Sequence, residues 1–315
     1  MIPLAAIERA GETIRGAAIR TPLVRLEVDA PAEIWLKLEN LQPIGSFKIR
    51  GAVNAIRDAP WDAVAGGVVT ASAGNMAQGV AWAARERGVA ATIVVPEQAP
   101  QTKLDAIARL GGTVVEVAYE RWWQAIVESR YDEAGGLFVH PVQDDAVMAG
   151  NGTIGLELAE DLPDADAIVV PWGGGGLFTG IASAVSAVRP DTKLYAVQPE
   201  TGAAVRVAVE AGEPRETTFT PSWVDGAGAK VVLPAMWERA RPLLDGTAVV
   251  SLAETAAAVR LLAERARVVA EGAGALALAA ALGGQVPGER LVCIVSGGNI
   301  DTGRLASILR SEPQD

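Results

Sequence analysis

The chain has 315 residues, of which 50% are hydrophobic and 21% are charged, and its formal net charge at pH 7 is −11. A chain of this length forms one large domain or two ordinary ones, and this composition excludes an intrinsically disordered protein. The acidic balance argues against a nucleic acid or an anionic membrane surface as a partner, because both repel a negatively charged protein.

Cysteine and histidine each occur once, as Cys293 and His140. A single cysteine excludes an internal disulfide bond, and a single histidine excludes a histidine-rich metal site and disfavours a Ser-His-Asp hydrolase. We expect Cys293 to be a buried packing residue and His140 to be structural. The N-terminal segment lacks the pattern of a signal peptide, and the alanine-rich stretch 272–286 is shorter than a membrane span. We therefore expect a cytoplasmic protein.

Short runs of β-branched residues alternate with longer alanine-rich stretches. The apolar runs are continuous, which is typical of strands buried on both faces of a parallel sheet, and the rhythm predicts an α/β protein with two open twisted sheets. We predict a large domain of residues 1–60 plus 146–315 and a small domain of residues 61–145. The predicted strands are 67–70, 91–95, 113–117, 168–171, 193–197 and 291–296, and the predicted helices are 77–87, 102–110, 150–160, 176–188 and 252–270. Residues 201–234 read as an irregular loop that covers a cleft.

The first stretch that could carry chemistry is KLENLQPIGSFKIRGA, from Lys37 to Ala52. A Gly-Ser turn and Phe47 precede Lys48, which stands at the start of a helical pattern. The positive end of a helix dipole disfavours a cation and lowers the pKa of the amine, as a lysine needs in order to attack an aldehyde. Taken alone, a solvated surface lysine is the simpler interpretation.

Two glycine-containing turns follow predicted strands and open predicted helices. The first is SAGNMAQG at Ser72–Gly79, where free backbone N–H groups and Asn75 could hold a carboxylate. The second is the four-glycine run from Gly173 to Gly176, whose N–H groups can converge on the oxygens of a monophosphate without a lysine or arginine. The second turn is not a P-loop, because no Gly-Lys-Ser/Thr follows it.

A third turn, SGGN, follows the last predicted strand and begins with Ser296. A hydroxyl at the carboxyl edge of a parallel sheet faces the crevice in which ligands of open α/β folds bind. The lysine, the monophosphate cup, the carboxylate turn and this serine together describe one ligand. That ligand is pyridoxal 5′-phosphate joined to an amino acid.

The four motifs, in this order, resemble those of the fold type II pyridoxal-phosphate enzymes, in the branch of serine/threonine dehydratases and serine racemases. The resemblance covers almost the whole chain and implies a tryptophan synthase β-like fold, with the cofactor in the cleft between two domains, and a homodimer. It implies that Lys48 forms the Schiff base and removes the substrate α-proton, that Phe47 packs against the cofactor and that Ser296 meets the pyridine nitrogen. It further implies a phosphate site at Gly173, Gly174, Gly175, Gly176 and Leu177, and a carboxylate loop of Ser72, Ala73, Gly74, Asn75 and Met76, with Asn75 also near the cofactor 3′-oxygen.

The chain departs from the family pattern at three places. Ala73 stands where related racemases have a serine base, which disfavours racemisation. Met76 replaces the usual histidine beside the carboxylate site. The divalent-cation site of some relatives aligns with Gln198, Gly202 and Ala204, so we predict no metal site there. The C-terminal regulatory domain of biosynthetic threonine dehydratases has no counterpart in these residues, and feedback through it is not expected.

A neutral serine at the pyridine nitrogen makes the cofactor a weaker electron sink, which favours loss of a β-hydroxyl over transamination. We therefore predict an ammonia-lyase that dehydrates and deaminates L-threonine or L-serine to a 2-oxo acid. The open alternatives are a hydroxyaspartate or another unusual substrate, a racemase, a β-replacement enzyme, and an inactive pyridoxal-phosphate-binding protein. Arg50 is the candidate for holding an acidic substrate, and three tryptophans weakly suggest an unusual side chain (Trp172, Trp223 and Trp237).

Overall fold

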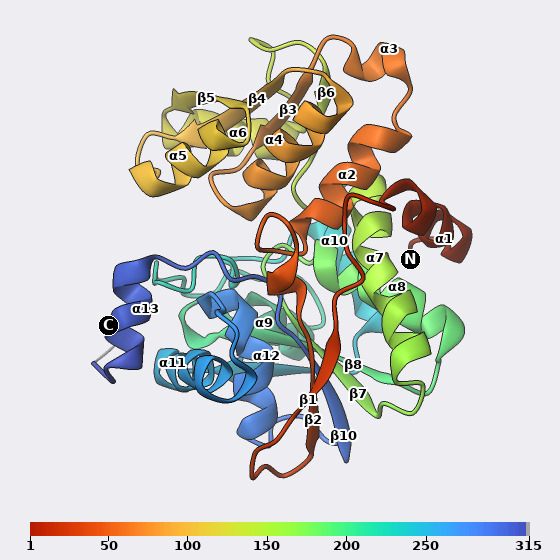
Figure 1. Ribbon diagram of the computed structural model, residues 1–315, viewed down its shortest axis with the longest axis vertical. Helices are drawn as coiled ribbons and strands as arrows, with labels where there is room; N and C mark the ends of the chain where they lie inside the picture. The colour runs from red at the N-terminus through yellow and green to blue at the C-terminus, as the bar shows by residue number, and fades with distance from the viewer. Residues whose placement is uncertain (313–315) are drawn as a thin grey trace.

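The computed structural model describes residues 1–312 and contains two β-sheets (Figure 1). The six-stranded sheet has the order β1-β2-β10-β7-β8-β9, and all of its pairs are parallel except β1 with β2. The four-stranded sheet has the order β5-β4-β3-β6 and is wholly parallel. In sequence order the strands are β1 (Leu23–Leu26), β2 (Glu33–Lys37), β3 (Val68–Ala71), β4 (Ala91–Pro96), β5 (Gly112–Val117), β6 (Leu137–Phe138), β7 (Ala167–Pro171), β8 (Lys193–Pro199), β9 (Gly246–Val250) and β10 (Arg290–Ile294).

Helices cover both sheets, and the four-stranded sheet with its helices forms the upper part of the molecule in Figure 1. The α-helices are α1 (Leu4–Thr13), α2 (Lys48–Asp58), α3 (Trp61–Val64), α4 (Asn75–Arg87), α5 (Gln101–Arg109), α6 (Tyr119–Glu128), α7 (Asp145–Asp161), α8 (Gly176–Val188), α9 (Ala204–Ala211), α10 (Pro234–Ala240), α11 (Leu252–Leu261), α12 (Gly272–Leu282) and α13 (Thr302–Leu309). Short helical turns are η1 (Glu39–Leu41), η2 (Glu200–Gly202), η3 (Arg241–Leu243) and the π-helical η4 (Leu262–Ala266).

The predicted α/β class is confirmed, and each of the six predicted strands is present with bounds that differ by at most two residues. Strands β1, β2, β6 and β9 were not predicted. The first two lie at one edge of their sheet and carry charged side chains, so they lack the continuous apolar run of a central strand. In the part of the chain that the structure describes, no helix is long and apolar enough to cross a membrane.

One predicted helix, residues 252–270, begins where predicted but is too long at its C-terminal end. α11 ends at Leu261, η4 continues to Ala266, and Arg267 has a left-handed φ of +61° that stops the helix. Tertiary hydrogen bonds hold the next residues extended, because Asn40 Nδ2 donates to Val269 O at 2.9 Å and Glu271 N donates to Gly297 O at 3.0 Å. The predicted loop 201–234 is also partly wrong, since it contains α9.

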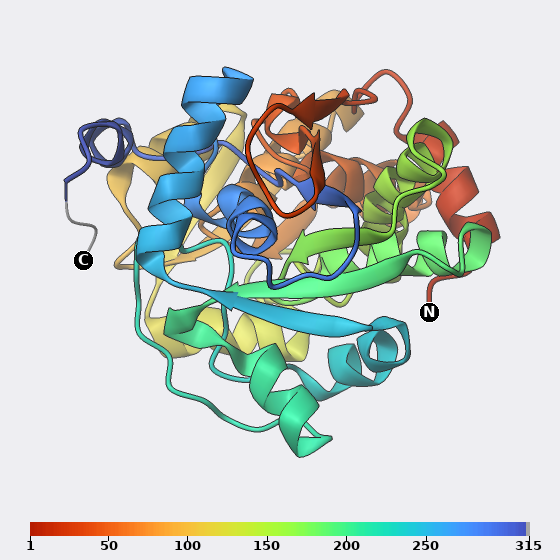
Figure 2. The same ribbon diagram turned by 90° about the horizontal axis from the view of Figure 1, so that it is seen from below.

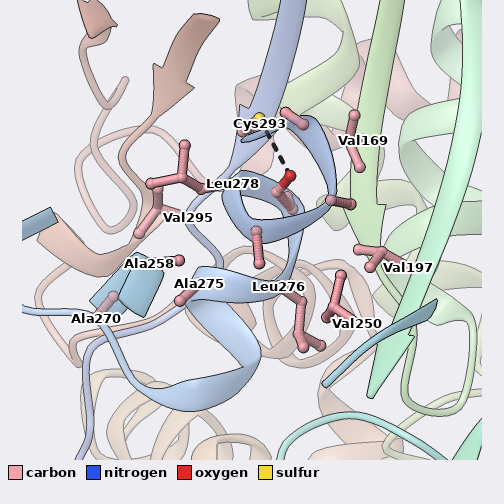
Figure 3. Close-up of a cluster of buried hydrophobic side chains, with 14 of the residues drawn as sticks. Val169, Val197, Val250, Ala258, Ala270, Ala275, Leu276, Leu278, Cys293 and Val295 are labelled. Carbon is pink, nitrogen blue, oxygen red and sulfur yellow. Dashed lines mark hydrogen bonds between the residues drawn. The ribbon is translucent and has the colours of Figure 1, made fainter. Parts of the chain in front are cut away.

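The largest apolar core lies under α12, whose residues are almost all buried (Figure 3). α12 packs against β7, β8, β9 and β10, and in the view from below α11 and α12 lie on one face of the six-stranded sheet (Figure 2). Cys293 belongs to this core, and its Sγ donates to Ala277 O at 3.4 Å. Burial raises the pKa of the Cys293 thiol, which confirms the predicted packing role.

Helix α2 lies between the two sheets and packs on both α4 and α7 (Figure 1). Glycines permit these close crossings. A methyl group at Gly79 would lie 3.2 Å from Lys48 O, and one at Gly51 would lie 2.8 Å from Val147 O. The apolar face of α2 belongs to the same core as β3 and β4. The first residue of α2, Lys48, therefore has a rigid support on both sides.

Candidate active site

A cavity of about 650 Å³ lies between the two sheets and opens at the carboxyl ends of their strands. This edge is where parallel α/β sheets bind ligands, because strand-to-helix loops converge there. The structure brings the predicted cofactor and carboxylate residues to its wall: Phe47, Lys48, Ser72, Ala73, Gly74, Asn75, Met76, Gly173, Gly174, Gly175, Gly176, Leu177 and Ser296. The individual roles of these residues stay predictions.

Lys48 is the first residue of α2, and its Nζ donates to Pro141 O at 3.0 Å. The Nζ atom also lies 5.1 Å from the centroid of the Phe47 ring. Burial lowers the pKa of Lys48 to about 8, while the nearby Glu271 carboxylate raises it. The sequence pattern predicts a pKa lowered by the helix dipole, whereas in the structure burial is the main cause. At pH 7 roughly a tenth of the amine is therefore unprotonated and available as a nucleophile, compared with well under a thousandth for an ordinary lysine.

The pH dependence of attack by Lys48 follows from this pKa. In the cofactor-free protein, we expect the rate of covalent attachment of pyridoxal phosphate to fall about tenfold per pH unit below pH 8, because only the neutral amine reacts. Above pH 8 the rate levels off, whereas an ordinary lysine would gain rate up to about pH 10. Stopped-flow absorbance across pH 6–10 measures this profile. An inflection above pH 10 would contradict the assignment.

The glycine run follows β7 and opens α8, and the structure requires glycine at each position. A methyl group at Gly173 would lie 2.9 Å from Gly226 O, one at Gly176 would lie 2.9 Å from Val142 O, and one at Gly174 would collide with the side chain of Val142. Gly175 has a left-handed φ of +96°, and a methyl group there would lie 2.6 Å from the Trp172 ring. These four glycines form a cradle that is packed against Gly226, Val142 and Trp172 on one side and lines the cavity on the other. On the cavity side, its backbone N–H groups can bind an anion. The cradle fits the phosphate of pyridoxal phosphate.

Gly175→Ala is expected to weaken pyridoxal-phosphate binding at least about tenfold, because relief of the left-handed backbone and of the contact with the Trp172 ring displaces the cradle. Titration of the cofactor-free protein by absorbance measures the dissociation constant. Gly212→Ala is the matched control, because Gly212 has a φ of +76° but no atom within 4 Å of the added methyl group. The control should lower the free energy of unfolding and leave the dissociation constant unchanged; equal effects of the two variants on binding would contradict the cradle.

The SGGN turn and the start of α2 are hydrogen-bonded to each other. Phe47 N donates to Ser296 O at 3.0 Å, and Ser46 forms a bridge with Gly297. Ser296 is buried at the end of β10 and lines the cavity. These contacts fix the distance between the lysine and the serine, which come from opposite ends of the sequence. Their spacing is therefore set by direct backbone contacts between the start of α2 and the turn after β10.

Glu271 is a cavity residue that the sequence analysis missed. Its Oε1 accepts a hydrogen bond from Asn75 Nδ2 at 2.7 Å, and it is 8% exposed. Burial and the Asp225 carboxylate raise the pKa of Glu271 to about 8. A signal was present, since Glu271 is the sole charged residue between Arg267 and Glu289. A lone carboxyl in an apolar stretch calls for a specific partner.

Arg50 does not line the cavity, and its proposed role with an acidic substrate is wrong. The guanidinium is buried and bonds Glu39 Oε1 at 2.8 Å and Glu157 Oε1 at 2.6 Å. The Arg50 guanidinium is therefore neutralised by these two carboxylates and is not available to a substrate in the cavity. The basic residues that line the cavity besides Lys48 are Lys103, which pairs with Asp225 across the mouth, and Arg109.

The three tryptophans that suggested an unusual substrate side chain are packing residues. Trp172 and Trp237 belong to a buried core and Trp223 packs on another, so these tryptophans give no side-chain pocket, although Trp122 on α6 lines the cavity. Met76 is 2% exposed at the base of the carboxylate loop.

Gln198 is held by two backbone groups. Its Oε1 accepts from Val205 N at 2.7 Å, and its Nε2 donates to Trp172 O at 3.4 Å. The amide thus joins β8 to the residue before the glycine run.

His140 confirms its predicted structural role. Its Nδ1 accepts from Val142 N at 3.0 Å and from Gln143 N at 2.9 Å, and its Nε2 donates to Ile126 O at 3.2 Å. Burial lowers the pKa of His140 to about 4, although the hydrogen bond to Ile126 O raises it. The ring is therefore neutral and serves to shape the turn that carries Pro141, the acceptor for Lys48.

Known proteins resemble this chain over almost its full length. The chain is 40% identical to the L-threonine ammonia-lyase of Thermotoga maritima over 98% of its own length and 78% of that protein. It is 36% identical to a catabolic L-threonine dehydratase of Staphylococcus aureus, over 98% of the chain and 92% of that protein. Among solved structures, maize serine racemase superposes with a TM-score of 0.88 at 32% identity, covering 98% of this chain and 97% of that one. The predicted tryptophan synthase β-like fold is confirmed by such structures. Because the model of the pyridoxal-phosphate dependent enzymes also matches residues 14–297, the chain belongs to this family.

Proposed function

We propose that the protein is an ammonia-lyase that converts L-threonine or L-serine into a 2-oxo acid and ammonia. The observation that carries the proposal is the position of Lys48, with a pKa near 8, in one cavity with the glycine cradle and the carboxylate loop. Support for the reaction comes from relatives named as L-threonine ammonia-lyases and dehydratases.

Different residues of the cavity would contact different parts of pyridoxal phosphate. The cradle of Gly173–Gly176 with Leu177 would hold the phosphate, Phe47 would contact the ring, and Ser296 would face its nitrogen. When bound, the cofactor supplies an aldehyde for the amino group and an electron-withdrawing ring. Asn75 lies at the opposite wall, where it is available to the 3′-oxygen and to the substrate.

Two groups act on the substrate. The N–H groups at the start of α4, with Ser72 and Asn75, would hold its α-carboxylate, as helix N-termini hold anions. Lys48 Nζ would accept the α-proton, and its neutral form near pH 8 suits a general base. The β-hydroxyl would leave as hydroxide, which with one proton, equal to the one that Lys48 accepts, makes water. The enamine that remains would hydrolyse to the 2-oxo acid and ammonia.

A turnover screen tests the reaction. Purified protein loaded with pyridoxal phosphate is offered L-threonine, L-serine and the hydroxyaspartates, and 2-oxo acid is measured by reduction with a dehydrogenase. We expect 2-oxobutanoate from L-threonine and pyruvate from L-serine. Turnover of a hydroxyaspartate alone would replace the substrate proposal, and no 2-oxo acid from any of them would overturn the activity.

Racemisation is the second candidate, because maize serine racemase is among the similar structures. It would need a proton carrier on the face of the substrate opposite Lys48, and Ala73 in the carboxylate loop carries no such group. We expect Ala73→Ser to introduce D-serine formation from L-serine that the unchanged protein lacks. Chiral chromatography measures the product, and Ala73→Val is the size control. D-serine from the unchanged protein would favour the racemase.

We also propose a homodimer in the cytoplasm and a division into residues 1–60 plus 146–315 and residues 61–145. The dimer rests on the family resemblance, and the division is supported by the strands of the four-stranded sheet, which all lie between residues 68 and 138. Sedimentation equilibrium measures the oligomeric state.

A further inference from the structure

Glu271 stands at the point where the two sheets meet. It directly precedes α12, its N–H donates to Gly297 O at 3.0 Å, and its side chain reaches into the cavity. The nearest partner of its carboxyl comes from the other side of the cleft, since Asn75 is the first residue of α4 on the four-stranded sheet. Asn75 and Glu271 are 196 residues apart in the chain, and their hydrogen bond joins the two sheets.

Both ends of the Asn75 amide are held. Its Nδ2 donates to Glu271 Oε1 at 2.7 Å, and its Oδ1 accepts from Asn299 Nδ2 at 2.7 Å. Asn299 is oriented in turn, because its Nδ2 also donates to Ile44 O at 2.9 Å. A flipped Asn75 would set its NH₂ group against that of Asn299 and would withdraw the N–H that Glu271 Oε1 accepts. Glu271 and Asn299 therefore select one orientation of the amide.

We propose that Glu271 is a positioning residue: with Asn299, it fixes the Asn75 amide and closes the carboxylate loop of Ser72–Met76 against the large sheet. The expected effect of Glu271 on turnover rests on the proposed function, since that loop would hold the substrate carboxylate. An amide nitrogen carries two N–H bonds. Glu271 takes one of those of Asn75 and leaves the other for a ligand in the cavity.

Glutamine is the closest replacement for Glu271, because the surroundings of Glu271 favour its neutral, protonated form. Burial and Asp225 raise the pKa of Glu271 to about 8, while Asn75, Lys103 and Lys48 lower it. At pH 7 the carboxyl is therefore largely protonated, and one of its oxygens acts as a carbonyl acceptor for Asn75. Glu271→Gln keeps such an acceptor, whereas Glu271→Ala removes it.

Hydrogen exchange of the cofactor-free protein tests this role without reference to turnover. We expect Glu271→Ala to raise the exchange rate of the backbone amides in residues 72–79 about fivefold, the equivalent of one lost hydrogen bond. Glu271→Gln should stay within twofold of the unchanged protein, and Asn299→Ala should match Glu271→Ala. Glu86→Ala, which removes an exposed carboxyl from the same helix α4, is the control and should leave the segment unchanged.

Steady-state kinetics with L-threonine gives the second readout. Because the loop binds the carboxylate and does not move the proton, Glu271→Ala should raise KM about tenfold and lower kcat less than threefold, and Glu271→Gln should recover most of the loss in KM. An unaltered exchange rate in both Glu271→Ala and Asn299→Ala, or equal damage from Gln and Ala, would overturn the positioning role. If no amino acid is turned over, the proposed function fails, while the exchange result still decides the role of Glu271.

Discussion

Lys48→Ala is expected to lower the rate of 2-oxo acid formation from L-threonine about 10³-fold, within the range that a positioned general base contributes. The variant loses both the amine that links to the cofactor and the acceptor of the α-proton. Among the described residues, Lys48 makes a side-chain hydrogen bond to Pro141 O and lies over the Phe47 ring, but it forms no ion pair whose partner would be left without a counter-charge. We therefore expect the melting temperature of the cofactor-free protein to change by only a few degrees.

The matched control for Lys48 is Lys103→Ala. Both lysines line the cavity, but Lys103 is at its mouth and pairs with Asp225. We expect Lys103→Ala to lower the rate of 2-oxo acid formation less than about tenfold, because its ion pair is partly exposed and contributes little. The measurement is single-turnover formation of 2-oxobutanoate, followed by borohydride reduction and peptide mapping of the cofactor site. A Lys48→Ala variant that keeps more than a tenth of the rate, or a label on Lys103, would contradict the role of Lys48.

Arg50→Met is expected to lower the free energy of unfolding by about 3–5 kcal/mol, because it leaves a buried carboxylate without its partner. Arg50 is 1% exposed and Glu39 is fully buried, and their atoms meet at 2.8 Å. Glu157 completes the cluster through Arg50 Nη1 at 2.6 Å and Lys37 Nζ at 2.6 Å. Denaturant unfolding at pH 7 measures the loss.

Two controls separate burial from charge. Arg15→Ala removes an exposed pair with Glu12, whose side chains are 74% and 68% exposed, and should cost less than about 1 kcal/mol. The double variant Arg50→Met/Glu39→Gln removes the orphaned charge and should regain part of the loss. A loss below about 1 kcal/mol for Arg50→Met would show that the cluster does not stabilise the fold.

The loss in Arg50→Met should also depend on pH. Burial raises the pKa of Glu39, but in the unchanged protein Arg50 and Thr21 more than offset this and hold the pKa below its usual range. A carboxyl with a lowered folded pKa stabilises the protein above the unfolded pKa, and this contribution is lost as the pH falls. Without Arg50 the folded pKa lies above the unfolded value, so the sign reverses. The deficit of the variant should be largest above about pH 5 and shrink on acidification.

Several features were predicted from sequence because they depend on neighbouring residues. Gly173–Gly176 between an apolar run and a helical pattern identifies a strand, a turn and a helix N-terminus without knowledge of distant residues. Lys48 and Ser72–Met76 were predicted in the same way, since both stand in a turn that opens a helical pattern. The continuous apolar runs indicated the central parallel strands. Short-range sterics and backbone hydrogen bonding decide all of these features.

Other features depend on which distant segments come together. A carboxyl at position 271 and an amide at position 75 have no relation along the chain, and their bond exists because two sheets close on one another. Arg50 has the same local pattern as a solvated arginine, but Glu39 and Glu157 enclose it on the far side of α2. The helix through residues 252–270 is interrupted because Gly297 and Asn40 offer its backbone other partners.

The sequence by itself determined the α/β class and predicted a lysine at a helix start and a glycine run between a strand and a helix, since backbone conformation and the chemistry of single side chains are local properties. The tertiary structure alone decided the pKa of Lys48, the partner of Asn75 and the burial of Arg50. Desolvation and long-range hydrogen bonds depend on the surroundings that the complete fold provides, and these surroundings are formed by residues from every part of the chain.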